Sequence, residues 1–298
     1  MINGHRLVVF IPSGRKRTES ILITNLRRFP EIDEVQIWMN TDKPGTNEPQ
    51  APNSAGDEEW LRTLPTMWDK CKLYELPNGA VRKWPKQLST GQFYHYTTQP
   101  GTIYVRMDDD IVYVDDDYFK NMVQFRLDHL APPIICGNIV NNAVTSYIQQ
   151  HYGHFDKKHG VVESRYCMDL VGWRSPEFAI YVHETLLDHI DRGTVSSLFF
   201  GRQDLDNTRF SICNFSFLGE RMAKMRPQID DEEIWLTEKM PVRDKVANLI
   251  CGDALVSHYS FFDQRPALDK TDILARYKKI AEDKLSAKYY ELLGHADG

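Results

Sequence analysis

The stretch that decides the fold is residues 102–112, TIYVRMDDDIV, in which a β-rich run leads directly into three aspartates. Residues 103–107 are mostly apolar or β-branched, which is typical of a strand buried inside an α/β sheet. Asp108, Asp109 and Asp110 follow at the end of that strand, the edge where open α/β sheets bind their ligands. Adjacent like charges repel one another, and a divalent cation relieves the repulsion because hard cations prefer oxygen ligands. The alternative interpretation of the triplet by itself is a solvated acidic turn.

The composition is that of an ordinary globular protein. The chain has 298 residues, enough for one large domain or two small ones, and 42% of them are hydrophobic and 26% charged. No apolar run reaches the roughly 18 residues of a membrane-spanning helix. The five cysteines form no CxxC pair, and their odd number favours reduced thiols in the cytoplasm over disulfides or a structural zinc site. The net charge of −6 shows no sign of a polyanion-binding surface.

Strands and helices alternate along the first third of the chain. Strands are predicted over residues 7–11, 34–39 and 72–76, and helices over 18–29 and 86–97. This alternation predicts a mainly parallel sheet with helices on both faces.

The remaining elements follow from turn residues and from helical spacing. Residues 42–57 are rich in Pro, Gly, Asn and Ser and are predicted to form a surface loop. Helices are predicted over 116–130 and 177–190, and a strand over 133–139. Apolar residues recur at helical spacing through 269–293, which predicts an amphipathic C-terminal helix.

Three further segments carry residues suited to chemistry. The loop PSGR at residues 12–15 follows the first predicted strand, and a glycine followed by cations at this point suits a nucleotide. Residues 230–233 are four acids at the start of a helical stretch, where they stabilise the helix N-terminus or supply a general base. His258 ends an apolar run, where it is either a packed core residue or the imidazole that completes a carboxylate metal site.

In their order and spacing, these segments resemble glycosyltransferases of the GT-A fold over about residues 6–262. The resemblance implies an α/β, Rossmann-like, mainly parallel sheet flanked by helices. In that family a DxD motif, here Asp108-Asp109-Asp110, works with Mn²⁺ or Mg²⁺, which bridges the motif and the diphosphate of a nucleotide sugar. The metal ligands that the resemblance implies in this chain are Asp110, His258 and Asp108.

The resemblance also implies which residues bind and activate the substrates. Inverting members carry an acidic pair at a helix start, which implies Asp231 as the base, or Glu232 because the acidic run continues. The donor, expected to be a UDP-sugar, would contact residues of the first loop, a lysine and the triplet: Pro12, Ser13, Gly14, Arg15, Lys86, Asp108 and Asp109. The acceptor or sugar contacts would be Asn138, Asn141, Asn142 and Asp230. The three asparagines would otherwise form turns.

The expected organisation is one GT-A-like domain over residues 1–298. Its nucleotide-binding half covers about residues 1–115, its acceptor half about 116–262, and its helical tail about 263–298. The expected function is metal-dependent transfer of a sugar from a nucleotide sugar to a carbohydrate or other hydroxyl acceptor, with inversion.

Other functions compete with this interpretation. Metal-dependent phosphatases and nucleases also cluster aspartates, but residues 11–14, IPSG, offer no further metal ligand. Residues 183–187, HETLL, lack the second histidine of the HExxH zinc proteases. A catalytically inactive sugar- or nucleotide-binding protein stays open. So does a phage-type enzyme that glycosylates a modified DNA base, although the acidic net charge counts against nucleic acid.

Overall fold

The computed structural model describes residues 4–40, 54–75, 91–223 and 231–294. Two of the predicted site residues, Lys86 and Asp230, lie outside the described residues, as do most of the predicted loop at 42–57 and the start of the predicted helix at 86–97.

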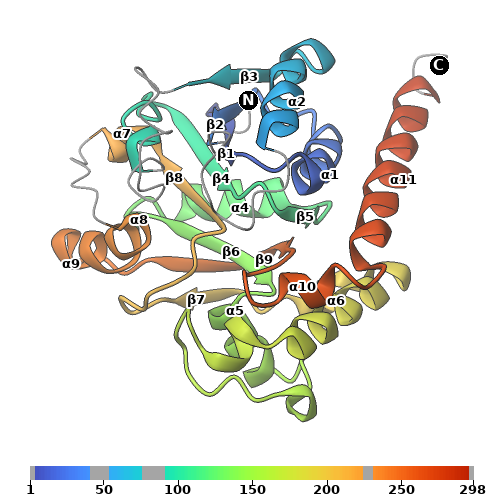
Figure 1. Cartoon of the computed structure of the whole chain (residues 1–298). Helices are drawn as coiled ribbons and strands as arrows, with labels where there is room; N and C mark the ends of the chain where they lie inside the picture. The colour runs from blue at the N-terminus through green and yellow to red at the C-terminus, as the bar shows by residue number, and fades with distance from the viewer. Residues whose placement is uncertain (1–3, 41–53, 76–90, 224–230, 295–298) are drawn as a thin grey trace.

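One sheet contains all nine strands of the described residues, in the order β3-β2-β1-β4-β8-β6-β9-β5, with β7 paired to β9 (Figure 1). The strands are β1 (Arg6–Ser13), β2 (Glu34–Met39), β3 (Cys71–Tyr74), β4 (Thr102–Met107), β5 (Ile111–Val114), β6 (Ile135–Val140), β7 (Arg202–Asp204), β8 (Asn214–Leu218) and β9 (Leu249–His258). The pairings make β1, β2, β3, β4, β6 and β9 run one way and β5, β7 and β8 the other. The sheet is therefore mainly parallel, as predicted.

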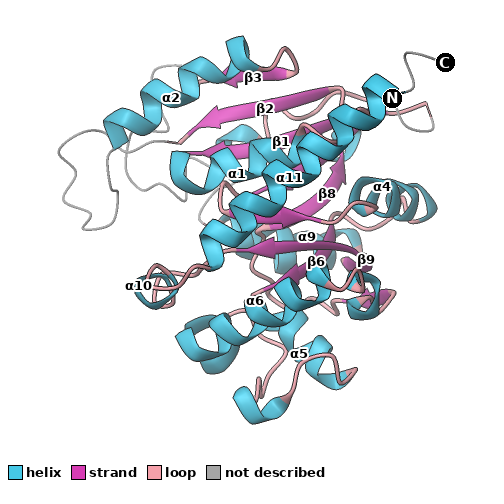
Figure 2. Ribbon diagram, turned by 90° about the vertical axis from the view of Figure 1, so that its right-hand side faces the viewer, coloured by secondary structure: helices cyan, strands magenta, loops and turns pink. Residues whose placement is uncertain are grey.

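Helices flank this sheet, and the longest of them is the last (Figure 2). The helices are α1 (Lys16–Leu26), α2 (Ser54–Met67), α4 (Tyr118–Asp128), α5 (Ala143–His151), α6 (Pro176–Asp191), α7 (Gly219–Met222), α8 (Glu232–Ile234), α9 (Met240–Asp244), α10 (Arg265–Leu268) and α11 (Ile273–Gly294). Short 3₁₀ turns are η2 (Lys157–His159) and η4 (Val195–Leu198), and π-helical turns are η3 (Leu170–Arg174) and η5 (Trp235–Lys239).

The predicted amphipathic C-terminal helix is confirmed as α11, which contacts α1, β5 and α6. Its buried side chains include Ile273, Tyr277 and Ala281, each four residues from the next, so they form one stripe along the helix. This stripe packs into a hydrophobic core shared with Phe178 of α6 and Leu255 of β9. The larger core lies around β1, β2 and β4.

Several elements depart from the predictions: β5, β7, β8, β9 and α5 had no predicted counterpart, and α2 and β8 show why. Helix α2 begins at Ser54, so residues 54–57 of the predicted loop are helical. Their Ser, Gly and Asp composition is typical of loops, but a serine or an acid is also favourable in the first turn of a helix. Strand β8 was not predicted, because its short sequence NFSFL mixes polar and apolar residues. It is buried throughout between β4 and β6, so all of its side chains pack inside the protein.

All five cysteines are free and buried, in agreement with the expectation of reduced thiols. No helix within the described residues has both the length and the apolar character needed to cross a membrane.

Candidate active site

The candidate site lies at one edge of the sheet, where the carboxyl ends of β1, β4 and β9 meet because these strands run the same way. Arg15 follows β1, Asp108 follows β4, and His258 is the last residue of β9. Strand β8 runs the other way, so the residue before it, Cys213, lies at the same edge, and its carbonyl accepts a hydrogen bond from the Asp108 N–H at 2.8 Å. A cavity of about 390 Å³ opens here. This volume is typical of small-molecule sites.

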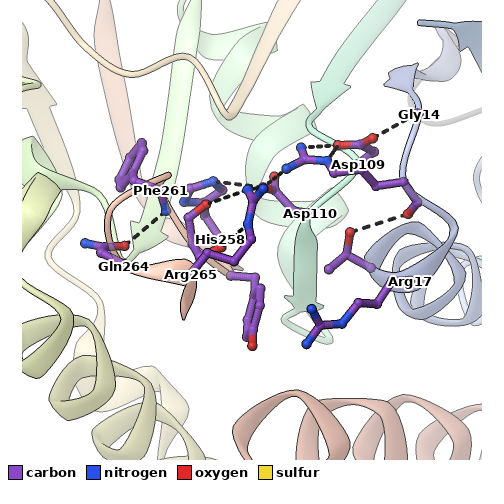
Figure 3. A network of polar contacts seen from close by, with 12 residues as sticks. Gly14, Arg17, Asp109, Asp110, His258, Phe261, Gln264 and Arg265 are labelled. Atoms are coloured by element: carbon purple, nitrogen blue, oxygen red, sulfur yellow. Dashed lines mark hydrogen bonds and ion pairs between the residues drawn. The ribbon is translucent and has the colours of Figure 1, made fainter. Parts of the chain in front are cut away.

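Asp109 holds the loop that follows β1. The Gly14 N–H donates to Asp109 Oδ2 at 2.9 Å, and Arg15 Nε donates to Asp109 Oδ1 at 2.8 Å (Figure 3). Glycine suits position 14 because a Cβ there would lie 3.0 Å from the carbonyl oxygen of Asn40, a tight contact. Asp109 thus aligns the two segments that were predicted to bind the nucleotide.

Pro12 and Ser13 belong to β1, are buried and do not line the cavity, so their predicted contact with the nucleotide sugar stays a prediction. The Ser13 hydroxyl donates to the carbonyl of Ile11 at 3.1 Å. Among residues 12–15, Arg15 is the one that lines the cavity.

Asp110 lies at the centre of a cluster of cations. Its Oδ2 is 2.8 Å from a guanidinium nitrogen of Arg15, 3.4 Å from His258 Nε2 and 3.8 Å from Arg265 (Figure 3). The pairing of β5 with β9 sets this arrangement, since the Tyr259 N–H donates to the Asp110 carbonyl at 2.8 Å. Burial opposes the charge on Asp110, but Arg15, His258 and Arg265 outweigh it and hold its pKa below the usual range.

His258 turns one ring nitrogen towards Asp110. Its Nδ1 is 3.3 Å from the carbonyl oxygen of Asn141, so a proton on Nδ1 leaves Nε2 directed at Asp110. Metal-binding histidines are commonly oriented by such a backbone carbonyl. Burial by itself lowers the pKa of His258, but Cys213 and the Asp110 carboxylate raise it well above the usual value. His258 is 3% exposed and lines the cavity. Its position is therefore compatible with a packed core residue and also with a metal ligand.

Asp108 is linked to the acidic run at 231–233 by Arg106, a residue that the sequence analysis did not consider. A guanidinium nitrogen of the buried Arg106 lies 2.9 Å from Asp108 Oδ1, and another lies 3.4 Å from Glu232 Oε1. Burial raises the pKa of Asp108 to about 6, with a contribution from Asp110 and against the effect of Arg106. Asp108 therefore gains a proton more readily near neutral pH than Asp110 does.

The acids at 231–233 have three different environments. Asp231 is the N-cap of α8: its Oδ1 accepts from the Ile234 N–H at 3.0 Å, and its Oδ2 is 3.2 Å from Arg209. Glu232 accepts a hydrogen bond from the Tyr94 hydroxyl and pairs with Arg106. Both carboxylates are therefore engaged within the protein, and neither residue lines the cavity.

Glu233 is the acid of this run that lines the cavity. Arg209 Nε donates to its Oε1 at 2.6 Å, and Cys167 Sγ lies 3.5 Å from the same oxygen. Burial raises the pKa of Glu233, and the ion pair with Arg209 opposes that rise. A carboxylate with a raised pKa beside a cavity has the properties of a general base.

The three asparagines predicted to bind sugar hydroxyls are fully buried instead. Asn138 donates to the carbonyls of Leu198 and Gly252, both at 3.0 Å. Asn141 has a left-handed backbone and donates to the Tyr259 carbonyl and to Gln264. Asn142 is the N-cap of α5 and accepts from the first backbone N–H groups of that helix. This burial contradicts their predicted role in sugar binding. The turn alternative fits Asn141, Asn142 caps a helix, and Asn138 lies inside β6.

The kinds of donor at this edge fit a divalent cation. Asp108 and Asp110 offer carboxylate oxygens and His258 an imidazole nitrogen, a set that suits Mn²⁺ or Mg²⁺. Asp110 Oδ1 is buried and has no hydrogen-bond partner among the described residues. However, no three His, Cys, Asp or Glu side chains of the described part of the chain already surround a single point. A cation here would therefore replace Arg15, whose guanidinium contacts Asp109 and Asp110.

Sequence analysis missed several residues of the site. Glu233 was within the flagged acidic run, but nothing in the run shows which acid faces the cavity. Arg209, Trp173 and Arg265 also line the cavity. Arg209 comes from a loop, Trp173 from the turn η3 and Arg265 from the start of α10, and none of them belongs to a local motif. Only the pairing of distant segments brings them together.

Comparison with known proteins identifies no family. No family model and no curated protein matches this chain. One solved structure with a similar fold is the 4-diphosphocytidyl-2C-methyl-D-erythritol synthase of Anaerococcus prevotii, at 15% identity and a TM-score of 0.32; the match covers 47% of this chain and 57% of that one. Another is a CMP:2-keto-3-deoxy-manno-octonic acid synthetase in complex with CTP, at 12% identity and a TM-score of 0.44, with coverage of 93% and 99%. At these values neither structure says what this chain binds.

Proposed function

We propose that this chain is a metal-dependent, inverting glycosyltransferase that uses a nucleotide sugar, with a UDP-sugar as the expected donor. The observation that carries the proposal is the convergence of three groups on one cavity. Two aspartates and a histidine line it, as do two arginines beside them, and Glu233 lies on its wall. Carboxylates for a cation, cations for phosphates and a separate, partly buried carboxylate are the groups that such a transfer requires.

The donor side would bind the diphosphate. Asp108, Asp110 and His258 would hold the cation, which supplies positive charge for a leaving group that departs as an anion. Arg15 and Arg265 lie close enough to Asp110 to contact phosphate oxygens at the same place. Arginine suits this role because its planar guanidinium pairs with phosphate through two hydrogen bonds.

The acceptor side would supply the base, and the geometry favours Glu233 over the predicted Asp231 and its alternative Glu232. The acceptor oxygen attacks the anomeric carbon, the bond from that carbon to the diphosphate oxygen breaks, and the diphosphate leaves with the electron pair. The hydroxyl proton passes to Glu233. Among the described residues, Arg209 and Cys167 both contact Oε1 of this carboxylate, so Oε2 is the oxygen that would take the proton. Asp231 would then act as a helix cap.

The test is a screen of nucleotide sugars by thermal shift and by release of nucleoside diphosphate, each with Mn²⁺ and with a chelator. We expect one class of donor to raise the melting temperature only when the cation is present, because a ligand that binds the native state stabilises it. Asp110→Asn should abolish this shift. Asp117→Asn, which changes an exposed aspartate of a surface ion pair, is the matched control and should leave it intact.

Two results would overturn the proposal. One is that no nucleotide sugar binds under any condition while the protein is folded. The other is that the Asp110→Asn variant, assayed in the presence of chelator, binds and turns over the donor normally. Transfer to DNA that contains hydroxymethylcytosine, and to no carbohydrate, would keep the chemistry and change the acceptor. We also infer a cytoplasmic location, which the five free and buried cysteines support.

A further inference from the structure

Four large apolar side chains line the cavity, although most of the other lining residues are charged or polar. We call these four residues, Met168, Trp173, Phe261 and Phe262, the apolar wall. Phe262 is 55% exposed and Met168 is 41% exposed, so large apolar groups of this cavity face solvent. Exposed apolar side chains gathered at a cavity are more informative than scattered ones, because they indicate a binding surface.

The wall is held in place by its surroundings. Trp173 belongs to the π-helical turn η3, and such turns are frequent at functional sites. Asp169 caps the turn by accepting from the N–H groups of Val171 and Gly172. A Cβ on Gly172 would lie 2.7 Å from the Ala143 Cα, so only glycine lets this turn pack against the start of α5. The Trp173 indole is therefore held by a turn that is capped and closely packed.

The neighbouring Phe261 is fixed from the other side. Its backbone N–H donates at 3.1 Å to Oε1 of the buried Gln264, which also accepts from Asn141 (Figure 3). The Phe261 ring lies 6.0 Å from the Trp173 ring and 4.5 Å from the His258 ring, measured between ring centroids. The apolar wall thus begins next to the proposed metal ligand.

Polar groups stand close to this wall. Cys167, the neighbour of Met168, contacts Glu233 Oε1, so the wall and the proposed base are adjacent. Arg209, Ser211 and Ser260 line the same cavity. A ligand bound here would meet an aromatic surface on one side and hydrogen-bonding groups on another.

We propose that Trp173, Phe261, Phe262 and Met168 form the acceptor subsite and that the acceptor presents a pyranose ring to it. A pyranose has a face of C–H groups and a rim of hydroxyls. The C–H groups carry partial positive charge and stack on the negative face of an aromatic ring. The hydroxyl rim would reach Glu233 and Arg209. The net charge of −6 favours an uncharged sugar over a nucleic acid. This inference rests on the proposed function, because it assigns the acceptor of the same reaction.

The test is saturation-transfer NMR on the full chain with methyl pyranosides of glucose, galactose and N-acetylglucosamine. We expect the ring protons of at least one of them to receive saturation from the protein. Trp173→Ala should weaken its binding on the order of tenfold, and Trp173→Phe should retain most of the affinity, since a stacking surface remains. Phe262→Ser changes an exposed residue and should also weaken binding. Leu170→Ala is the control, because Leu170 is 70% exposed in the same turn and does not line the cavity.

The proposal is overturned if no methyl pyranoside binds to the wild type. It is also overturned if the Trp173→Ala and Phe262→Ser variants bind a methyl pyranoside as tightly as the wild type does. Binding of an oligonucleotide that contains hydroxymethylcytosine, lost in Trp173→Ala, with no pyranoside bound would also overturn it. The two proposals fail in different ways. Cation-dependent donor binding without pyranoside binding contradicts this inference alone. Pyranoside binding that depends on Trp173, without binding of any nucleotide sugar, supports the subsite and contradicts the transferase.

Discussion

The two sides of the cavity are built in different ways. The proposed donor side consists of residues at the ends of strands that run the same way: Arg15 after β1, Asp110 after β4 and His258 at the end of β9. The acceptor side consists of residues from turns and short helices, such as Trp173 of η3 and Glu233 of α8. The donor side is thus held by the hydrogen bonds of the sheet. The acceptor side is held by caps, close packing and ion pairs.

The difference also appears in how charge is balanced. On the donor side the carboxylates already have cations as partners, because Arg15 contacts both Asp109 and Asp110. On the acceptor side Glu233 has one cation, Arg209, and its pKa is raised by burial. On the proposed donor side, a metal ion would take the place of the Arg15 guanidinium beside Asp110. On the proposed acceptor side, the raised pKa of Glu233 favours uptake of a proton. Changes on the two sides should affect different measurements.

The largest expected effect is on the acceptor side. Glu233→Gln should lower the rate of transfer by about 10²–10⁴-fold and leave donor binding intact, because a general base typically contributes that factor. Transfer by the wild type should fall as the pH drops through the raised pKa of Glu233, since the base must be ionised, and this acid limb should disappear in the variant. The measurements are single-turnover rates against pH and donor affinity by calorimetry.

Asp231→Asn and Glu232→Gln serve as matched controls for the position of the base. We expect both to be milder than Glu233→Gln, because their carboxylates bind groups of the protein. If Asp231→Asn is the inactive variant and still folds as the wild type does, the base is at the position that the family resemblance implied. A product with retained anomeric configuration would contradict a general base at all three positions.

A smaller effect is expected on the donor side. His258→Ala should weaken Mn²⁺ binding by about tenfold or more, by analogy with the losses seen when residues behind metal ligands are changed. Calorimetric titration with Mn²⁺ measures this, and thermal unfolding in chelator measures stability separately. His151→Ala, at an exposed histidine, is the control. A lower melting temperature with unchanged Mn²⁺ affinity would show that His258 is a core residue only.

The smallest expected effect separates the two roles of Arg15. Arg15→Gln removes the guanidinium that contacts Asp109 and Asp110, so the carboxylates should bind Mn²⁺ more tightly, by a factor of about three to ten. The same change should weaken binding of a nucleoside diphosphate, which loses a cation. Arg192→Gln, in an exposed ion pair on α6, should change neither affinity. If both affinities fall in Arg15→Gln, the arginine supports the metal site instead of competing with a cation.

The donor side could be found from the sequence because its signals are local. Residues 103–107 form a buried strand followed by acids, and the first loop follows another such strand, so both were assigned to one edge of a parallel sheet. His258 was assigned because it ends an apolar run. The fold class, the strands of the first third of the chain and the C-terminal helix were accessible for the same reason, since hydrophobic periodicity reports which face of an element is buried.

The acceptor side could not be found in the same way. The acidic run at 230–233 was recognised, but whether Asp231 or Glu233 faces the cavity depends on the turn at which α8 begins. Asn138 was predicted to bind sugar from the end of a strand, yet it lies inside β6, donates hydrogen bonds to η4 and β9, and is fully buried. Composition alone does not distinguish an exposed asparagine from a buried one.

The amino-acid sequence by itself determined the alternation of strands and helices, the acidic triplet at a strand end and the amphipathic last helix. These depend on neighbouring residues, whose spacing decides which side chains can be buried together. Only the tertiary structure decided that Arg15 forms ion pairs with Asp109 and Asp110, and that Glu233 is the residue of 231–233 that lines the cavity. It also decided that Trp173 and Phe261 line the same cavity. Those relations join segments far apart in the chain, and their positions are set by the packing of the whole sheet and its loops.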